Sequence, residues 1–390
     1  MSQPNILDLI KGIPVEWKAL GDVVKLQRGK RLVRSQLEEA GDYAVYQNSM
    51  KPLGYYHEGN VKPDTAFIIG AGAAGEVGYS DVGFWAADDV YFLLNSKSTV
   101  SKYLFHFLLT QQHKILSQVR RASIPRLSRA AIEKLQIPIP YPDNPKKSLI
   151  IQAEIVRILD TFTELTSELT SELNARKKQY NYYRDQLLSF EDGQAEWKTL
   201  SEIAEYSKTR ISFAELDEDN YVGVDNLLQN KSGKTESTRV PVSGNSTQYC
   251  ENDILIGNIR PYLKKIWQAD LIGGTNGDVL VVRLTDKAVN SRYLYQVLAD
   301  DKFFDYNMQH AKGAKMPRGD KAKIMEYSVP VPPLAEQARI VTILDKFDTL
   351  TTSLSEGLPR EIQLRQQQYE YYRDLLLSFP RPEATAAVNT

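Results

Sequence analysis

The longest regular pattern in the chain is a stripe of apolar residues that begins near Ile151 and recurs in steps of three and four. This spacing places the side chains on one face of an α-helix. Asn144 and Pro145 precede the stripe and suit an N-cap and a first-turn proline. The pattern therefore predicts a helix of about 40 residues, roughly 60 Å long at 1.5 Å per residue. The stripe consists of Ile155, Ile158, Phe162, Leu165, Leu169, Leu173, Tyr180, Tyr183 and Leu187.

The segments around this stripe occur twice in the chain. YYRDQLLSF at residues 182–190 returns as YYRDLLLSF at residues 371–379, and IVRILD at 155–160 returns as IVTILD at 340–345. Such self-similarity indicates a duplicated unit, so we expect a second long helix, with Pro333 near its start. Between the matched segments the two halves differ. We call the divergent stretch of each half its body, and the divergence indicates that the two bodies recognise different things.

A helix this long cannot bury its apolar stripe alone, so we expect it to pack against the second copy. Antiparallel pairing within the chain would place one body at each end of the helix pair. A coiled coil with an identical chain is the alternative. The second copy is four residues longer, with 26 positions from Asp345 to Tyr371 against 22 from Asp160 to Tyr182. The surplus falls at EGLP, residues 356–359, where proline and glycine predict a kink or break.

The two bodies carry short strand-like runs and brief helical ones, which predicts an α+β fold. Two similar α/β domains would be separated by a pair of long antiparallel, coiled-coil-like helices, with an internal pseudo-twofold repeat. Expected strands are residues 66–69, 90–94, 253–256 and 279–284, and expected body helices are 102–109 and 292–298. The predicted parts are a first body at 1–145, a helix at 146–190, a second body at 191–333, a helix at 334–379 and a disordered tail at 380–390.

Charge and cysteine content restrict the kinds of function. The chain has 48 Lys and Arg against 49 Asp and Glu, a net charge of −1, so any surface for nucleic acid must be a local patch. The single cysteine, Cys250, excludes an internal disulfide and a cysteine-based zinc site, and the four histidines lack metal-ligand spacing. We expect no metal, no membrane span, no signal peptide and a cytoplasmic location.

Residues 70–75 read GAGAAG and match the dinucleotide-binding pattern G-x-G-x-x-G. That pattern must open a helix, whereas residues 76–90 contain Gly78 and Gly83 and read as turn and strand. The matching stretch of the second half, residues 257–262, does not keep the pattern. We therefore expect a tight turn with close backbone approach and no bound cofactor. The sequence shows no phosphate-binding loop, methyltransferase motif or nuclease arrangement.

Basic residues gather at equivalent places in both halves, around Pro125 and Pro317. A charged run is usually a solvated face, but recurrence beside the same proline in two diverged bodies favours contact with DNA. Arg and Lys hold phosphates or read guanine, and Asn48 and Asn226, which correspond, would read adenine or cap a turn. The candidate DNA-binding residues are Arg28, Lys30, Arg31, Arg34, Asn48, Lys51, Arg120, Arg121, Arg126, Lys208, Arg210, Asn226, Arg260, Lys264, Lys265, Lys312, Lys315, Arg318 and Lys321.

Several segments resemble those of the specificity subunits of type I restriction–modification systems. The two closing segments, IPIPYP…QAEIVRILDTF…YYRDQLLSF and VPVPPLAEQARIVTILDKF…YYRDLLLSF, are the most specific, and the resemblance covers nearly the whole chain. Two TSEL units at residues 166–169 and 170–173 are similar to tetrapeptide repeats of one branch of that family. GNIRPYLKK and GAGAAGEVGY also resemble recurrent strand–turn segments of the family.

The resemblance implies that each body is a target-recognition domain for one half of a split site in double-stranded DNA. The helices would set the spacing and dock two methyltransferase subunits, and restriction subunits would join to cut DNA. S-adenosylmethionine, Mg and ATP would belong to those partners, and this chain would hold no catalytic residue. Two alternatives are an enzyme, such as a fused or solitary methyltransferase, and a scaffold that gathers proteins with its long helices and has no role on DNA.

Overall fold

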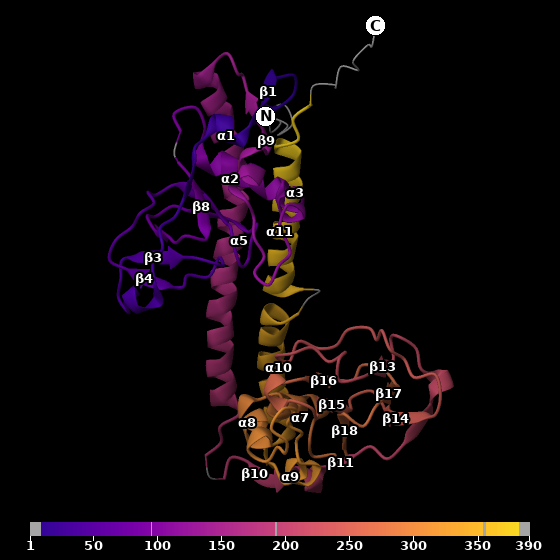
Figure 1. Ribbon diagram of the computed structural model, residues 1–390. Coiled ribbons are helices and arrows are strands. Elements are labelled where there is room, and N and C mark those ends of the chain that lie inside the picture. Colours follow the sequence, from indigo (N-terminus) through magenta and orange to yellow (C-terminus); the bar gives the residue numbers. More distant parts are fainter. Residues whose placement is uncertain (1–8, 95, 192, 354–355, 382–390) are drawn as a thin grey trace. The chain divides into compact units, whose positions relative to one another are not determined.

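The structure is a computed structural model that describes residues 9–94, 96–191, 193–353 and 356–381 (Figure 1). The chain divides into two compact units. Unit 1 comprises residues 1–167 and 364–390, and unit 2 comprises residues 168–363. Two long helices, α5 (Pro145–Leu187) and α11 (Gly357–Leu376), contribute residues to both units.

Unit 1 has three sheets within its described residues. Strand β1 (Val15–Ala19) pairs with β9 (Gln136–Pro140), and both other sheets lie in the body. The first of these has the strand order β2 (Leu26–Arg28), β8 (Val90–Leu93), β5 (Thr65–Ile69), β6 (Val77–Ser80). The second has the order β4 (Gly54–Tyr56), β3 (Tyr43–Tyr46), β7 (Trp85–Ala86). All of these pairs are antiparallel except β3 with β7. The helices are α1 (Leu20–Val23), α2 (Ser101–Thr110), α3 (Gln112–Ser117) and α4 (Arg129–Glu133).

Unit 2 repeats this plan. Strand β10 (Glu196–Thr199) pairs with β19 (Ser328–Val331). The first body sheet has the strand order β11 (Ala204–Tyr206), β18 (Val279–Leu284), β15 (Ile254–Gly257), β16 (Ile266–Gln268). The second has the order β12 (Arg210–Ser212), β14 (Asn245–Tyr249), β17 (Gly273–Thr275), β13 (Tyr221–Val222). The pair β13 and β17 is parallel, like β3 and β7. The helices are α6 (Leu200–Ile203), α7 (Ser291–Leu298), α8 (Asp301–Gln309), α9 (Lys321–Met325) and α10 (Leu334–Thr351).

The elements expected from the sequence are present. Strands β5, β8, β15 and β18 and helices α2 and α7 lie where the pattern placed them, to within about one residue at their ends. Helix α5 begins at Pro145, and the Asn144 side chain accepts a hydrogen bond from the Lys147 amide at 3.0 Å. Residues 70–75 form the turn between β5 and β6 and open no helix, as the sequence predicted. The mixed, repeated fold class is therefore confirmed.

The apolar stripe of α5 packs against other helices of the same chain. In unit 1 the first part of α5 runs antiparallel to α11 (Figure 1). Ile155 and Leu159 are fully buried, and the Phe162 ring stacks on Tyr372 of α11 at a centroid distance of 5.1 Å. In unit 2, Tyr180 stacks in the same way on Phe347 of α10 at 5.5 Å. Each large apolar side chain buried in this way contributes about 1.5–3 kcal/mol.

One residue of the predicted stripe departs from it. Tyr183 remains 41% exposed, although its ring also stacks against Phe347. Residue spacing assigns a side chain to one face of a helix. It does not show how much of a ring at the edge of that face stays exposed to solvent.

The second copy of the long helix is interrupted. Helix α10 ends at Thr351 and α11 begins at Gly357, whose φ is +75°. A β-carbon at Gly357 would collide with the Thr349 carbonyl, so this position requires glycine. Pro359 lies in the first turn of α11, where a missing amide hydrogen costs little.

Residues 380 and 381 contact the start of unit 1. Of the predicted tail at 380–390, residues 382–390 lie outside the described residues, but Pro380 accepts a hydrogen bond from the Trp17 indole at 3.0 Å. The Arg381 guanidinium lies over the Trp17 ring at 4.9 Å. The predicted domain boundaries stay a prediction, because the two units divide α5 between them. Within the described residues, no helix has the length and apolar content needed to cross a membrane.

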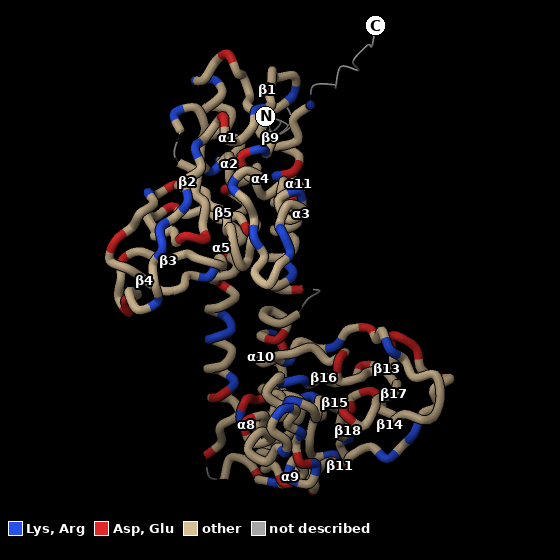
Figure 2. The backbone as a smooth tube through the Cα atoms, viewed as in Figure 1, with Lys and Arg blue, Asp and Glu red and all other residues tan. Residues whose placement is uncertain are grey.

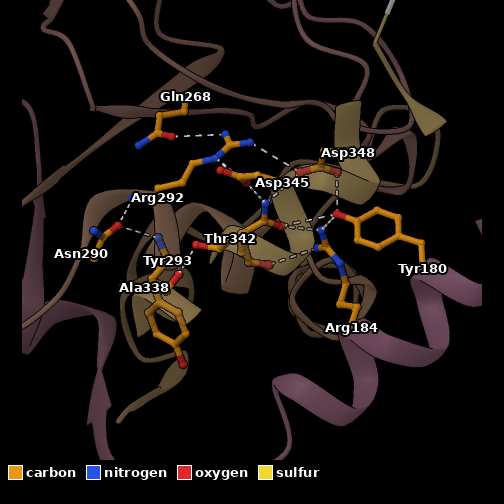
Figure 3. Close-up of polar contacts among 11 residues, drawn as sticks. Tyr180, Arg184, Gln268, Asn290, Arg292, Tyr293, Ala338, Thr342, Asp345 and Asp348 are labelled. Atoms are coloured by element: carbon orange, nitrogen blue, oxygen red, sulfur yellow. Dashed lines mark hydrogen bonds and ion pairs between the residues drawn. The ribbon is translucent and has the colours of Figure 1, made fainter. Parts of the chain in front are cut away.

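Polar contacts fix the body helix α7 of unit 2 to α5 and α10 (Figure 3). Arg292 donates to Asp345 of α10 at 2.8 Å. The Gln296 amide nitrogen donates to Asp345 at 2.7 Å and to Asp348 at 2.8 Å, and its oxygen accepts from Arg184 of α5 at 2.6 Å. Gln296 is fully buried, so each of these bonds satisfies a group that has no access to water.

The equivalent contacts in unit 1 use His106 in place of Gln296. Lys102 forms an ion pair with Asp160 at 2.8 Å, and His106 faces Asp160 at 3.4 Å through Nε2 and the Tyr369 hydroxyl at 2.8 Å through Nδ1. Burial lowers the pKa of His106, even though Asp160 faces it. Burial alone would raise the pKa of Asp160, but hydrogen bonds from His106 and Lys102 lower it overall.

A buried glutamine on α5 and another on α10 form a second pair of anchors. The Gln152 amide oxygen accepts from the Val100 amide, directly before α2, at 2.9 Å. Gln337 accepts in the same way from Asn290, directly before α7, at 2.7 Å. Both glutamines are fully buried, and a buried polar group left without a partner costs about 1–3 kcal/mol. The start of each body helix is therefore tied to its long helix.

The pH dependence of stability tests the His106 anchor. Because its pKa is lowered in the folded chain, the unfolded chain takes up a proton first as pH falls below about 6.5. The stabilisation from neutral His106 is therefore complete above that pH and is lost as pH falls below it, whereas Asp160 stays ionised in this range. His106→Gln, which installs the unit 2 side chain, should reduce the loss of stability between about pH 7 and about pH 5.

The midpoint of urea unfolding across this range measures the effect. His113→Gln is the control, because His113 is exposed in the same unit and its replacement should leave the acid sensitivity unchanged. Equal acid sensitivity of the wild type and His106→Gln would contradict a role for the buried imidazole.

Candidate nucleic-acid interface

Two loops, residues 120–126 in unit 1 and 312–318 in unit 2, have the same backbone closure. We call them the basic loops. Arg120 and Arg126 exchange two backbone hydrogen bonds of 2.9 and 3.1 Å, and Lys312 and Arg318 exchange two of 2.9 Å. Two bonds in opposite directions join the loop ends as a short antiparallel bridge. Each basic loop is therefore held as a defined projection.

In unit 1 the basic loop rests on the turn that follows the central strand β5. The Gly72 amide donates to the Pro125 carbonyl at 3.1 Å, and the Leu127 amide donates to Gly70 at 2.8 Å. Gly72 has φ of +84°, and a β-carbon there would lie 2.7 Å from the Asn48 carbonyl oxygen. The glycines predicted to allow close backbone approach therefore do so, and they bring Asn48 beside the basic loop.

Unit 2 builds the same support from different residues. The Arg260 amide donates to the Pro317 carbonyl at 2.7 Å, and the Gly319 amide donates to Asn258 at 3.1 Å, both on the turn after β15. Arg260 adopts a left-handed conformation with φ of +53°, which a non-glycine residue takes only where its surroundings impose it. Since these bonds are backbone to backbone, the arrangement survives the change of side chains.

A third segment of unit 1 joins this surface. Gly70 donates to the Asp89 carbonyl at 2.6 Å, and Arg28 donates to the neighbouring Asp88 carbonyl. The Lys30 amide donates to the Ala86 carbonyl at 2.9 Å. The start of the predicted basic run 28–34, the glycine turn and the basic loop thus form a connected set of segments. In unit 2, by contrast, Arg210 begins strand β12 of the other body sheet, and Lys208 forms an ion pair with Glu205.

Most of the predicted residues are accessible. The exposed ones are Arg28, Lys30, Arg31, Arg34, Asn48, Lys51, Arg120, Arg121, Arg126, Lys208, Arg210, Arg260, Lys312, Lys315, Arg318 and Lys321. Accessibility is a condition for contact with DNA, and whether each of them makes that contact stays a prediction.

Three predicted residues are half-buried and bound within unit 2. The Asn226 side chain accepts from the Gly223 amide at 2.9 Å and donates to the Glu236 carbonyl at 3.1 Å. It therefore fastens its own loop, which is the turn-capping alternative to reading adenine. Lys264 forms an ion pair with Asp301 at 2.9 Å, and Lys265 donates to the Val224 carbonyl at 2.6 Å. Sequence position alone could not show these internal partners.

The two basic loops differ in charge compensation. Lys312 pairs with Asp320 at 2.7 Å, and Arg318 pairs with Asp278 at 3.1 Å. In the part of unit 1 that the structure describes, Arg120, Arg121 and Arg126 have no such carboxylate. Figure 2 shows basic and acidic positions interspersed throughout both units, in keeping with the net charge of −1. The two basic loops therefore differ in how much of their positive charge is paired with carboxylates of the same unit.

The residues at the tips of the basic loops were not among the predicted site residues. Ile124 is 53% exposed and Met316 is 51% exposed, and each directly precedes the shared proline. The available signal was an apolar residue at the same place in two basic clusters. Among the described residues no group of three or more His, Cys, Asp or Glu is placed to hold a metal ion.

Comparison with known proteins gives a consistent result. The type I restriction modification DNA specificity domain matches this chain twice, at residues 14–178 and 194–364. The EcoR124I/EcoR124II specificity subunit of a type I restriction enzyme from Escherichia coli is 37% identical over 408 residues, 99% of this chain and 100% of that protein. A putative type I restriction enzyme specificity subunit from Haemophilus influenzae is 31% identical over 409 residues, 95% and 97% of the two chains.

Solved structures share the fold. The type I restriction–modification S subunit from M. genitalium has a TM-score of 0.64 at 18% identity, covering 97% of this chain and 98% of its own. A chain from work on complex assembly and conformational transition of the type I system has a TM-score of 0.57 at 14% identity, covering 94% and 99%. The repeated domain match and the full-length relatives show that this chain belongs to the specificity subunits of type I restriction–modification enzymes, the subunits that carry DNA sequence specificity.

Proposed function

We propose that each unit recognises one half of a bipartite target in double-stranded DNA. The observation that carries the proposal is the basic loop, which has the same closure and the same support in two otherwise diverged bodies. Cations on a defined projection position a protein on the phosphate backbone, and side chains that vary between the bodies supply the base contacts. Each body would thus read different bases with the same framework.

The chain docks two methyltransferase subunits, and restriction subunits join the complex. Equivalent tyrosines of the two matched segments, Tyr182 and Tyr371, are each 62% exposed. Exposed tyrosines at equivalent places favour contact with two copies of one partner, because a tyrosine packs its ring while its hydroxyl stays hydrogen-bonded. Family membership supports these partners, since a specificity subunit serves a larger enzyme.

The chain itself is not catalytic. Membership of the specificity subunits supports placing S-adenosylmethionine, Mg and ATP on the partner subunits, and this sequence contains no motif for methyl transfer, phosphate binding or nucleolysis. We expect the purified chain to turn over no S-adenosylmethionine and to cut no DNA. Labelled-methyl transfer to duplex DNA measures this, and transfer by the chain free of other proteins would support the solitary methyltransferase instead.

Salt dependence of DNA binding tests the basic loops. Replacing Arg120, Arg121 and Arg126 together by Ala should weaken binding to duplex DNA. It should also flatten the plot of log affinity against log salt by about 0.9 for each lost phosphate contact. Replacing Lys312, Lys315 and Arg318 should do the same with a smaller change, because Lys312 and Arg318 already have carboxylate partners.

Gel-shift titrations of the full chain at several salt concentrations measure both quantities. Arg176→Ala is the control, since Arg176 is paired with Glu172 on the long helix, away from either basic loop in the sequence. Unchanged affinity and slope in both triple variants would show that the loops are only solvated faces. Absence of any DNA binding by the wild type would favour the scaffold alternative.

Deleting one TSEL unit tests whether the helix sets the spacer between half-sites. Helix α5 continues through both units at residues 166–173. Four helical residues correspond to roughly 6 Å of rise and about 400° of rotation, so the apolar stripe stays nearly in register. The excess of about 40° is close to the twist of one base pair. Removal of residues 166–169 should therefore leave both half-sites unchanged and shorten the spacer, by about one base pair.

Methylation mapping of host DNA measures the spacer. A two-residue deletion is the control, because it rotates the stripe by about 200° and should abolish assembly. An original spacer, or altered half-site bases, in the four-residue deletion would refute the proposed role of the helix.

A further inference from the structure

The tips of the two basic loops carry large apolar side chains that the proposed phosphate contacts do not use. Ile124 is 53% exposed and Met316 is 51% exposed. Both occupy the fifth position of their loops, directly before the shared proline, and the exposure pattern of all seven positions is the same in the two units. Single exposed apolar side chains are common on protein surfaces, but recurrence at the same tip of two diverged loops indicates a partner that covers them.

The chemistry of these tips excludes reading bases by hydrogen bonds. Neither isoleucine nor methionine offers a donor or a strong acceptor. The neighbouring positions change in character, from Arg121 to Gly313 and from Ser123 to Lys315, while the tip stays apolar and large. Size and apolar character without a hydrogen-bond pattern are what a side chain needs to separate two stacked base pairs.

The loops are built to resist the force of such an insertion. Opening a base step costs a few kcal/mol, so a freely moving loop would bend away. Here each loop is closed by two backbone hydrogen bonds and supported by two more from the turn after the central strand. At the foot of the unit 1 loop, Leu127 is buried in the core of that unit. Cations on both sides of the tip, such as Arg120 and Arg126, would hold the phosphates beside it.

We propose that Ile124 and Met316 are wedges that insert between adjacent base pairs, one in each half-site, and kink the duplex. The proposal rests on DNA recognition by the two units and adds how the DNA is deformed. A kink at each half-site would make recognition depend on how easily a base step opens, in addition to direct base contacts.

The test uses the full chain and a duplex of about 30 base pairs that contains the target found by methylation mapping. Fluorescence transfer between dyes at the two ends measures bending, and 2-aminopurine placed at successive steps reports loss of stacking. Ile124→Ala and Met316→Ala should each lower affinity about tenfold, remove the kink in one half-site and leave the salt slope unchanged, because no phosphate contact is lost. Ile124→Met, which copies unit 2, should retain bending.

Exposed apolar residues elsewhere provide matched controls. Val82 is 62% exposed in unit 1 and Val242 is 86% exposed in unit 2, and replacing either by Ala should change neither affinity nor bending. Reduced affinity with full bending and unchanged 2-aminopurine signals would overturn the wedge in favour of contact with a groove edge. Wild-type affinity and bending in both Ala variants would overturn it as well.

Failure of the wedge and failure of the proposed function give different results. If the arginine variants of the basic loop flatten the salt slope while Ile124→Ala and Met316→Ala behave like the wild type, DNA recognition stands and the wedge is wrong. If the wild-type chain itself neither binds nor bends the target duplex, the proposed function is wrong, and the wedge proposal is wrong as well.

Discussion

One fully buried polar side chain in the middle of each body helix decides how that helix sits on the long helices. In unit 2 it is Gln296, whose amide has partners on α5 and α10, and in unit 1 it is His106, with partners on α5 and α11. Apolar packing opposes a slip of one helical turn, and paired buried polar groups make the position of the helix more specific still. A slip here would leave buried donors and acceptors unpaired, at a cost of about 1–3 kcal/mol for each group.

The position of the basic loops follows from this constraint through backbone hydrogen bonds. The body helix fixes the body, the central strand ends in a turn, and that turn binds the basic loop through main-chain groups only. Main-chain contacts do not depend on side-chain identity, so most of the exposed surface is free to vary. The glycine turn of unit 1 and the left-handed Arg260 of unit 2 show two different sequences reaching the same support.

The sequence predicted the features that depend on local spacing and on repetition. The long amphipathic helix, the central strands and the Asn144 cap of α5 follow from patterns within about 40 residues, and the repeated fold class follows from segments that recur later in the chain. The pairing of the two helix copies was predictable from the repeat, but the individual side chains that meet across long sequence separations were not. Tyr369 meets His106 across 263 positions, and Arg184 meets Gln296 across 112. For the same reason charge alone could not separate exposed Arg120 from Lys264, whose partner Asp301 lies on another element.

The division of unit 1 between the two ends of the sequence has a consequence for synthesis. Its core contains Leu376, Leu377 and Phe379, which the ribosome adds after the whole of unit 2, and unit 2 is one continuous stretch of chain. Domains generally fold as units while the chain emerges. The unit translated second can therefore complete its core first, and the unit translated first waits with apolar surface uncovered until translation nears residue 379. Nascent chains of this protein consequently pass through a long interval in which chaperones have a binding surface.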